Sequence, residues 1–226
     1  MKARLVLGVV AASCASLMTA VYVASRVVDE PVGVFTRDLV GIFEAPVYYG
    51  FISQVGVVLW SSCVAALALV VVLAHRGVIA RECLAPAWFF GLLTLWVLLD
   101  DAFLIHDGVY LAILPGRGEI LFVLYFVALL LGGWNHREFL SAQPLAPLLV
   151  VSIVALGASA GIDVVSDVLG LGELPAHEIW EDGVKLFGIL CWTTFFGDVA
   201  IRALSTPGSA PDASPEPTRP RQTEPN

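Results

Sequence analysis

The stretch Phe51–Ala74, FISQVGVVLWSSCVAALALVVVLA, is apolar almost throughout and carries no charged side chain. A helix that rises 1.5 Å per residue needs roughly 20 mainly apolar residues to cross about 30 Å of hydrocarbon. Lipid offers no hydrogen-bond partner to the backbone, so a segment that crosses it forms a helix. The stretch therefore predicts a transmembrane helix.

Five more stretches of this kind occur along the chain. We place these spans at about residues 5–25, 85–105, 120–134, 147–169 and 179–204. The span at 120–134 is short unless its flanks join it. The sequence thus predicts an all-α, polytopic bundle of about six transmembrane helices that occupies residues 1–204.

The composition agrees with a membrane protein. Of the 226 residues, 58% are hydrophobic and 14% are charged, with a mean hydropathy of +0.85, whereas a soluble domain carries roughly 25% charged residues. The spans leave no room for a folded extramembrane domain. With a net charge of −8 and no basic patch, nucleic-acid binding has no support. The four cysteines form no C-x-x-C pair and are expected to be buried as small apolar residues.

The basic residues predict the orientation. With an N-terminus in the cytoplasm, eight Lys and Arg residues fall on the cytoplasmic side and three on the outer side, and Lys185 lies inside the last span. The cytoplasmic set is Lys2, Arg4, Arg76, Arg81, Arg137, Arg202, Arg219 and Arg221, and the outer set is Arg26, Arg37 and Arg117. The excess inside predicts that both termini are cytoplasmic and that the protein is a multi-pass protein of the inner (cytoplasmic) membrane.

Three segments lie outside this simple pattern. Residues 1–25 also resemble a signal peptide, but the apolar run continues without a clear stop, which favours an uncleaved anchor. Residues 27–49 mix charges with apolar residues and are expected to lie at the outer interface. Residues 205–226 hold six of the 13 prolines, and we predict a disordered, Pro/Ser-rich cytoplasmic tail.

With this topology, most of the acidic residues lie on the outer side of the membrane. Five of them stand in or against apolar sequence: Asp100, Asp101, Asp163, Glu181 and Asp182. An ionisable residue at membrane depth costs at least a few kcal/mol and usually faces a bundle interior or a water-filled cavity. They predict a shared polar pocket near the outer face, with seven candidate residues: Asp100, Asp101, Asp107, Asp163, Asp167, Glu181 and Lys185.

The third span ends in the run Asp100-Asp101-x4-His106-Asp107. On a regular helix Asp100 and Asp107 share a face, but they lie about 10 Å apart along the axis. They cannot chelate one ion by themselves, and His106 points away from Asp100. Any metal site here must be completed by other helices.

The fifth and sixth spans bring further acids to the same end of the bundle. Asp163 and Asp167 are four residues apart, as are Glu178 and Asp182, and Glu181 can pair with Lys185 at the same spacing. Carboxylates from several helices build metal sites in helical bundles. We therefore consider Asp163, Glu178, Asp182 and His106 as candidate ligands of Mg²⁺, Mn²⁺ or Zn²⁺, with oxygen ligands favouring the harder cations.

A structural role explains the same residues without chemistry. Glu181–Lys185 would then be a buried ion pair, and Asp198–Arg202 an ion pair near the inner end. The tryptophans fit interface belts and helix packing better than a cofactor cage.

Three motifs resemble those of an uncharacterised family of bacterial multi-pass membrane proteins. They are Pro46–Gly56 with Trp60, the run Asp100–Asp107, and Glu181-Asp182-x2-Lys185-x2-Gly188 with Trp192. The likeness covers most of residues 44–200. It implies the fold and the position of the site, and it implies no activity. A weaker comparison, with the seven-helix membrane hydrolases, fails because their three-histidine zinc site has no counterpart here.

Three functions remain open at this point. The first is a metal-dependent enzyme that acts on a lipid or a lipid-linked substrate at the outer pocket. The second is proton- or cation-coupled transport or sensing, in which the same acids form a relay. The third is a scaffold or partner subunit whose polar network is structural; small residues on the fifth span, such as Gly157 and Gly161, would allow close helix packing in any of the three.

Overall fold

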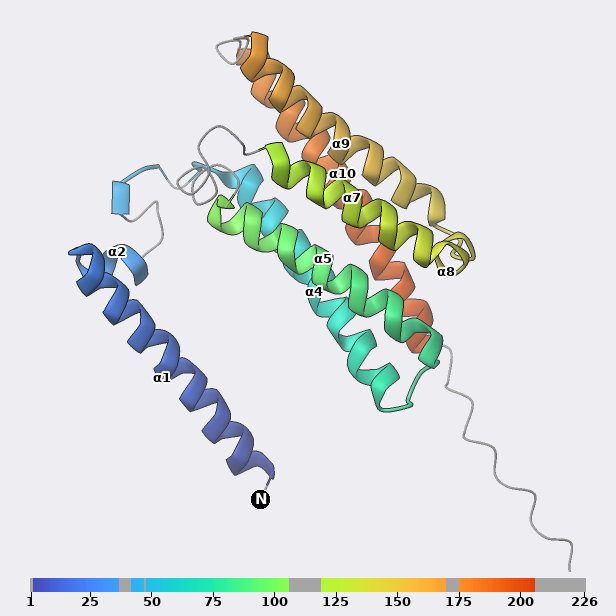
Figure 1. The fold of residues 1–226 in the computed structure, drawn as a ribbon, viewed down its shortest axis with the longest axis horizontal. Coiled ribbons are helices and arrows are strands. Elements are labelled where there is room, and N and C mark those ends of the chain that lie inside the picture. The colour runs from blue at the N-terminus through green and yellow to red at the C-terminus, as the bar shows by residue number, and fades with distance from the viewer. Residues whose placement is uncertain (1, 37–41, 47, 106–118, 170–174, 206–226) are drawn as a thin grey trace, which may run out of the picture. The chain divides into compact units, whose positions relative to one another are not determined.

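The computed structural model describes residues 2–36, 42–46, 48–105, 119–169 and 175–205. These residues form helices and no β-strand (Figure 1). The chain divides into two compact units, residues 1–51 and residues 52–226, and each is described by itself. The predicted tail at 205–226 lies outside the described residues except for Ser205, which is the last residue of a helix.

The first unit contains a long helix, α1 (Lys2–Val28), followed by the short helix α2 (Val32–Thr36). The 27 residues of α1 span about 40 Å at the helical rise. The chain leaves α1 through Asp29, whose φ of 60° places it in the left-handed region. The expected interfacial segment at 27–49 is described only in part, so its position at a membrane surface stays a prediction.

Five longer helices make up the second unit: α4 (Phe51–His75), α5 (Leu84–Phe103), α7 (Glu119–Asn135), α9 (Ala146–Leu169) and α10 (Pro175–Ser205). Successive helices run in alternating directions and lie side by side (Figure 1). The 3₁₀ turn η1 (Arg81–Cys83) leads into α5, and α8 (Arg137–Ser141) lies between α7 and α9. Each of the six predicted spans is helical, with ends that differ by up to four residues from the prediction.

Local sequence explains where these helices stop. Gly77, at φ +70°, ends the turn after α4, because glycine adopts the left-handed region without a steric penalty. Leu104 ends α5 in the left-handed region, and its backbone N–H bonds to the carbonyl of Asp100. Pro175 opens α10, where the missing N–H costs nothing.

Four helical segments are long and apolar enough to span a membrane by length and composition. They are Leu7–Val28, Phe51–His75, Arg81–Phe103 and Trp180–Ser205. The segments Leu121–Asn135 and Ala146–Ile162 are apolar but shorter. Large apolar side chains such as Val123, Leu131 and Val154 remain exposed on the second unit. Many exposed apolar side chains fit contact with lipid better than contact with water.

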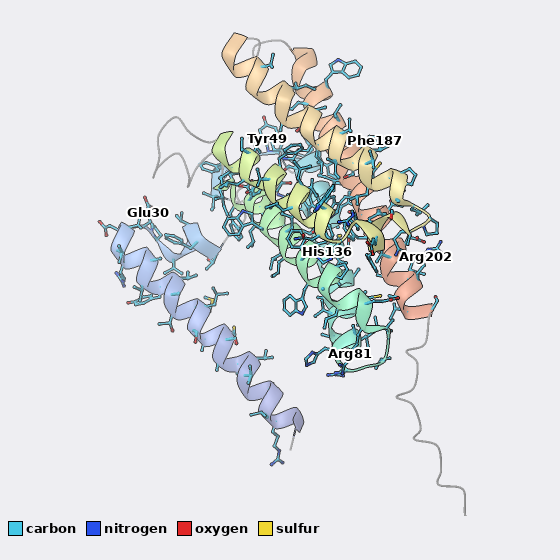
Figure 2. All side chains as sticks on the ribbon, turned by 45° about the vertical axis from the view of Figure 1, so that its right-hand side comes forward. Glu30, Tyr49, Arg81, His136, Phe187 and Arg202 are labelled. Atoms are coloured by element: carbon cyan, nitrogen blue, oxygen red, sulfur yellow. The ribbon has the colours of Figure 1, made fainter. Side chains whose placement is uncertain are left out.

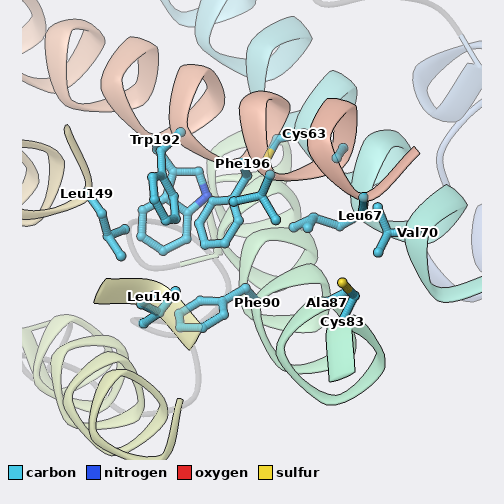
Figure 3. Packing of buried hydrophobic residues seen from close by; sticks show 14 of the residues in the cluster. Cys63, Leu67, Val70, Cys83, Ala87, Phe90, Leu140, Leu149, Trp192 and Phe196 are labelled. Atoms are coloured by element: carbon cyan, nitrogen blue, oxygen red, sulfur yellow. The ribbon is translucent and has the colours of Figure 1, made fainter. Parts of the chain in front are cut away.

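An aromatic cluster forms the core of the second unit. Phe90 of α5 packs against Trp192 and Phe196 of α10, with ring centroids 6.2 and 5.1 Å away (Figure 3). Trp60 of α4 meets Trp192 edge-on at 6.0 Å. Trp60 and Trp192 are core residues, 2% and 3% exposed, whereas Trp88, Trp96, Trp134 and Trp180 are exposed. Two tryptophans thus pack inside this unit, and the position of the other four in a membrane interface stays a prediction.

The cysteines follow their expected environment with one exception. Cys63, Cys83 and Cys191 are buried, and Cys14 on α1 is exposed. Basic side chains Arg81 and Arg202 lie toward the end of the second unit where α4 and α10 finish (Figure 2). Near that end Arg202 forms its predicted ion pair with Asp198 at 2.6 Å. The opposite half of the unit contains the polar residues described next.

Candidate functional site: an amphipathic cavity between the helices

Asp101, in the last turn of α5, binds side chains from two other helices. Its Oδ1 lies 2.8 Å from the Nζ of Lys185 on α10. Its Oδ2 accepts a 2.9 Å hydrogen bond from the indole Nε1 of Trp60 on α4. The carboxylate is only 11% exposed and the lysine side chain 38%. One carboxylate thereby joins α4, α5 and α10.

Asp100, the preceding residue, faces a different direction because successive helical residues are turned by about 100°. It is 3% exposed and lies against the interior. It lines the same cavity as Tyr125 of α7. The hydroxyl of Tyr125 is buried and makes no hydrogen bond within the described part of the chain.

The two aspartates border a cavity of about 190 Å³ between the helices of the second unit. Most of its wall is apolar and comes from α5, α7 and α9: Leu93, Val97, Phe122, Phe126, Leu129, Ile153, Leu156, Gly157 and Ala160. One side of the wall is polar, and we call it the polar end: Asp100, Asp101, Tyr125, Glu181 and Lys185. The cavity is therefore amphipathic.

A second and much smaller cavity lies on the other side of the Asp101–Lys185 pair. It measures about 30 Å³ and is lined by Ile52, Ser53, Gly56, Asp101, Asp182, Lys185, Leu186 and Ile189. A space of this size holds one water molecule. Because Asp101 and Lys185 line both spaces, the ion pair forms part of the wall between them.

Interhelical hydrogen bonds hold the walls in place. Trp192 donates from Nε1 to Thr94 at 3.1 Å, and Thr94 donates in turn to the carbonyl of Phe90 at 2.6 Å. Ser152 of α9 donates to the carbonyl of Gly188 on α10 at 2.8 Å. These partners are buried, and each satisfied donor removes a penalty of about 1–3 kcal/mol.

Two glycines allow the helices to approach closely. A Cβ at Gly188 of α10 would lie 2.8 Å from Leu156 Cγ and 3.2 Å from the backbone nitrogen of Leu156. A Cβ at Gly132 of α7 would collide with the ring of Phe89 on α5. The narrow spacing of α9 and α10 brings Glu181 and Lys185 beside the cavity, and Ser159 donates to the Glu181 carbonyl at 3.3 Å.

Comparison with protein families gives a match over residues 6–199, to a family described as a domain of unknown function (DUF8692). The chain belongs to the DUF8692 family. This agrees with the resemblance to an uncharacterised family, although a bacterial origin is not part of the match. No curated protein and no solved structure matches the chain.

In this DUF8692 chain, the structure brings together four of the seven residues predicted for the pocket. Asp100, Asp101, Glu181 and Lys185 line the cavity, and Asp182 lines the small cavity beside them. Sequence spacing offered Glu181, one turn from Lys185, as the partner of the ammonium group. It did not identify Asp101, 84 residues away, which provides the 2.8 Å salt bridge.

Other predicted residues cannot be placed in the site. His106 and Asp107 lie outside the described residues. Asp163, Asp167 and Glu178 lie on α9 and α10, but only their backbone is described. The helix α5 ends at Phe103, and Leu104 lies in the left-handed region. The expectation that Asp107 shares a helical face with Asp100 concerns a residue outside the described ones and stays a prediction.

The metal hypothesis is accordingly not tested. Of its four candidate ligands, Asp163, Glu178, Asp182 and His106, only the side chain of Asp182 is described. The described side chains contain no group of three His, Cys, Asp or Glu residues that would hold an ion. Mg²⁺, Mn²⁺ or Zn²⁺ binding therefore stays a prediction.

Trp60 and Tyr125 were missed as site residues. Both stand in apolar spans, and both have a polar atom that lipid cannot satisfy. A polar atom within an apolar span is therefore a signal in the sequence that a hydrogen-bond partner is needed. The sequence does not identify that partner, which for Trp60 is Asp101.

Proposed function

We propose that this protein is a six-helix integral membrane protein, with both termini in the cytoplasm, that binds an amphipathic lipid-like molecule in the cavity. The ligand's apolar part would lie against α5, α7 and α9, and its head group would lie at the polar end. The observation that carries the proposal is the amphipathic wall of the cavity of about 190 Å³. Ligand sites are mostly apolar with a few placed polar groups, as here.

The lining residues of α7 and α9 also fit a ligand that enters the cavity from the bilayer. Gly157 of α9 lines the cavity, and a Cβ placed there would meet no atom within 4 Å. Phe126 of α7, which is 50% exposed, lines the cavity as well. Both residues therefore reach the surface of the unit as well as the cavity, so a lipid chain could enter between α7 and α9 from the surrounding membrane.

The proposed orientation places the polar end near the outer face. Lys185 and Asp101 then lie in the outer halves of α10 and α5, and Arg76, Arg81, Arg137 and Arg202 lie at the cytoplasmic side. Asp198, in the inner half of α10, is paired with Arg202. An acid already paired in this way favours ligand binding at the outer end over a proton relay across the membrane.

A matched pair of alanines on α9 tests the proposal. Ala160 lines the cavity, whereas Ala158 is exposed and does not. The protein would be purified in detergent, and the bound amphiphile would be extracted and quantified by mass spectrometry. We expect wild type and Ala158→Phe to retain a bound molecule that Ala160→Phe loses. Equal retention in both variants, or no bound molecule in wild type, would contradict the proposal.

A further inference from the structure

We infer that the polar end selects a single-chain amphiphile whose head group bears hydrogen-bond donors, an amine or a hydroxyl, over one that ends in a phosphate. This inference rests on the proposed function and names the ligand class for the same cavity. It follows from the charge of the wall, from the hydrogen-bond donors already in use, and from the size of the cavity.

The described wall of the cavity is acidic. Asp100, Asp101 and Glu181 contribute three carboxyl groups, and Lys185 is the single basic residue among the described lining residues. Lys185 is engaged by Asp101 at 2.8 Å, so its charge is balanced within the wall. The described wall therefore has no positive excess that would bind a phosphate, and like charges repel strongly in a low-dielectric site.

Most of the hydrogen-bond donors of the wall are also engaged, and the Tyr125 hydroxyl is an exception. Trp60 donates to Asp101, Trp192 donates to Thr94, and Thr94 donates to Phe90. Ser159 donates to the Glu181 carbonyl. Phosphate recognition needs donors that converge on the oxygens, as in Arg clusters. This wall offers carboxylate acceptors in their place, which match a head group that donates.

Tyr125 adds a group that lacks a partner. Its hydroxyl is buried on the cavity side and makes no hydrogen bond with any described residue. A buried hydroxyl without a partner costs about 1–3 kcal/mol, so a head group that bonds to it is favoured. An amine or a hydroxyl head placed beside Tyr125 would also lie beside the carboxyl group of Asp100, which lines the same cavity.

The volume restricts the shape of the ligand. An apolar cavity of about 150 Å³ holds one benzene molecule, so about 190 Å³ holds a small head group and the first carbons of a chain. The rest of the chain must leave the cavity, and the exposed lining residues Gly157 and Phe126 mark the path that we propose for it. One chain passes such an opening more readily than two.

Three probes with the same chain test the selectivity: dodecylamine, dodecanol and dodecyl phosphate. The melting temperature of purified protein in uncharged detergent would be measured with each probe at the same mole fraction. Ala160→Phe, with its cavity filled, corrects for general effects of the probe on the micelle. We expect dodecylamine and dodecanol to raise the melting temperature of wild type, and dodecyl phosphate to leave it unchanged.

The outcomes separate this inference from the proposed function. If dodecyl phosphate stabilises wild type as much as dodecylamine does, the selectivity is wrong and the binding cavity stands. If none of the three probes acts on wild type beyond its effect on Ala160→Phe, the binding function itself is wrong. Glu181→Gln supplies an independent check: it should weaken dodecylamine binding roughly five-fold, the effect of a partly exposed charge pair, and weaken dodecanol binding less. Equal losses for both probes would overturn the role of charge.

Discussion

Asp101 and Lys185 lie 84 residues apart in the chain, yet their side chains meet at 2.8 Å in the wall between two cavities. The pair links the last turn of α5 to the first half of α10. Trp60 donates to the second carboxylate oxygen, so the pair is also connected to α4. Three helices are thus joined at this point.

The first prediction concerns the charge balance of this pair. Lys185→Met leaves Asp101 with no described cationic partner at 11% exposure. We expect a loss of about 1–3 kcal/mol, less than the 3–5 kcal/mol of a fully buried pair, because the lysine is partly exposed. Thermal unfolding in detergent measures it. The double variant Asp101→Asn with Lys185→Met removes both charges, and the amide oxygen at position 101 can still accept the hydrogen bond from Trp60. The double variant should therefore recover most of the lost stability. A double variant less stable than Lys185→Met alone would contradict this account.

The second prediction concerns the acceptor of Trp192. Thr94 is fully buried, and its hydroxyl accepts from the Trp192 indole at 3.1 Å. Thr94→Val keeps the shape and removes the acceptor, which should cost about 1–3 kcal/mol. Thr94→Ser keeps the hydroxyl and is the matched control, so its melting temperature should fall less. A larger loss in the serine variant would show that the methyl group, not the hydrogen bond, matters.

How much of this arrangement was predictable depends on whether a feature is local. Hydropathy locates α4 and α5 to within a few residues, because lipid forces each apolar run into a helix. Spacing along one helix found Asp198–Arg202 for the same reason. The Asp101–Lys185 pair depends on how α5 and α10 pack, and no spacing rule within a helix contains that information. The end of α5 at Phe103 could not be predicted from hydropathy either, because the apolar run continues to Ile105.

The third prediction concerns the close approach of α9 and α10. A Cβ at Gly188 would lie 3.2 Å from the backbone nitrogen of Leu156, and backbone cannot move aside cheaply. Gly188→Ala should therefore destabilise the protein by about 1–3 kcal/mol, as overpacking does. Gly183 lies on the same helix with no atom within 4 Å of an added Cβ. Gly183→Ala should be neutral or stabilising, since alanine favours a helix by about 1 kcal/mol over glycine. Equal melting temperatures for the two variants would refute this close packing.

The fourth prediction follows from the metal hypothesis for Asp163, Glu178, Asp182 and His106. If these residues bind an ion, elemental analysis of the purified protein should find about one equivalent of Mg, Mn or Zn per chain. Asp182→Asn should lose it, and the exposed Glu138→Gln on α8 should keep it. Metal absent from wild type, or unchanged in Asp182→Asn, ends the hypothesis without affecting the cavity.

The last prediction tests the proposed orientation, on which the outer position of the polar end depends. Ser53 is exposed and lines the small cavity beside Asp182, and Ser141 is exposed on α8. Cys63, Cys83 and Cys191 are buried, so replacing Cys14 by serine leaves no exposed native thiol among the described residues. In that background Ser53→Cys should react with a membrane-impermeant maleimide on intact cells.

Ser141→Cys is the matched control, because α8 begins at Arg137 and lies on the proposed cytoplasmic side. It should react only after the membrane is permeabilised. If Ser53→Cys fails to react on intact cells while Ser141→Cys reacts, the proposed orientation is wrong and the opposite one holds. The cavity would then receive its ligand's head group from the cytoplasmic leaflet, with the contacts of Asp101 and Lys185 unchanged.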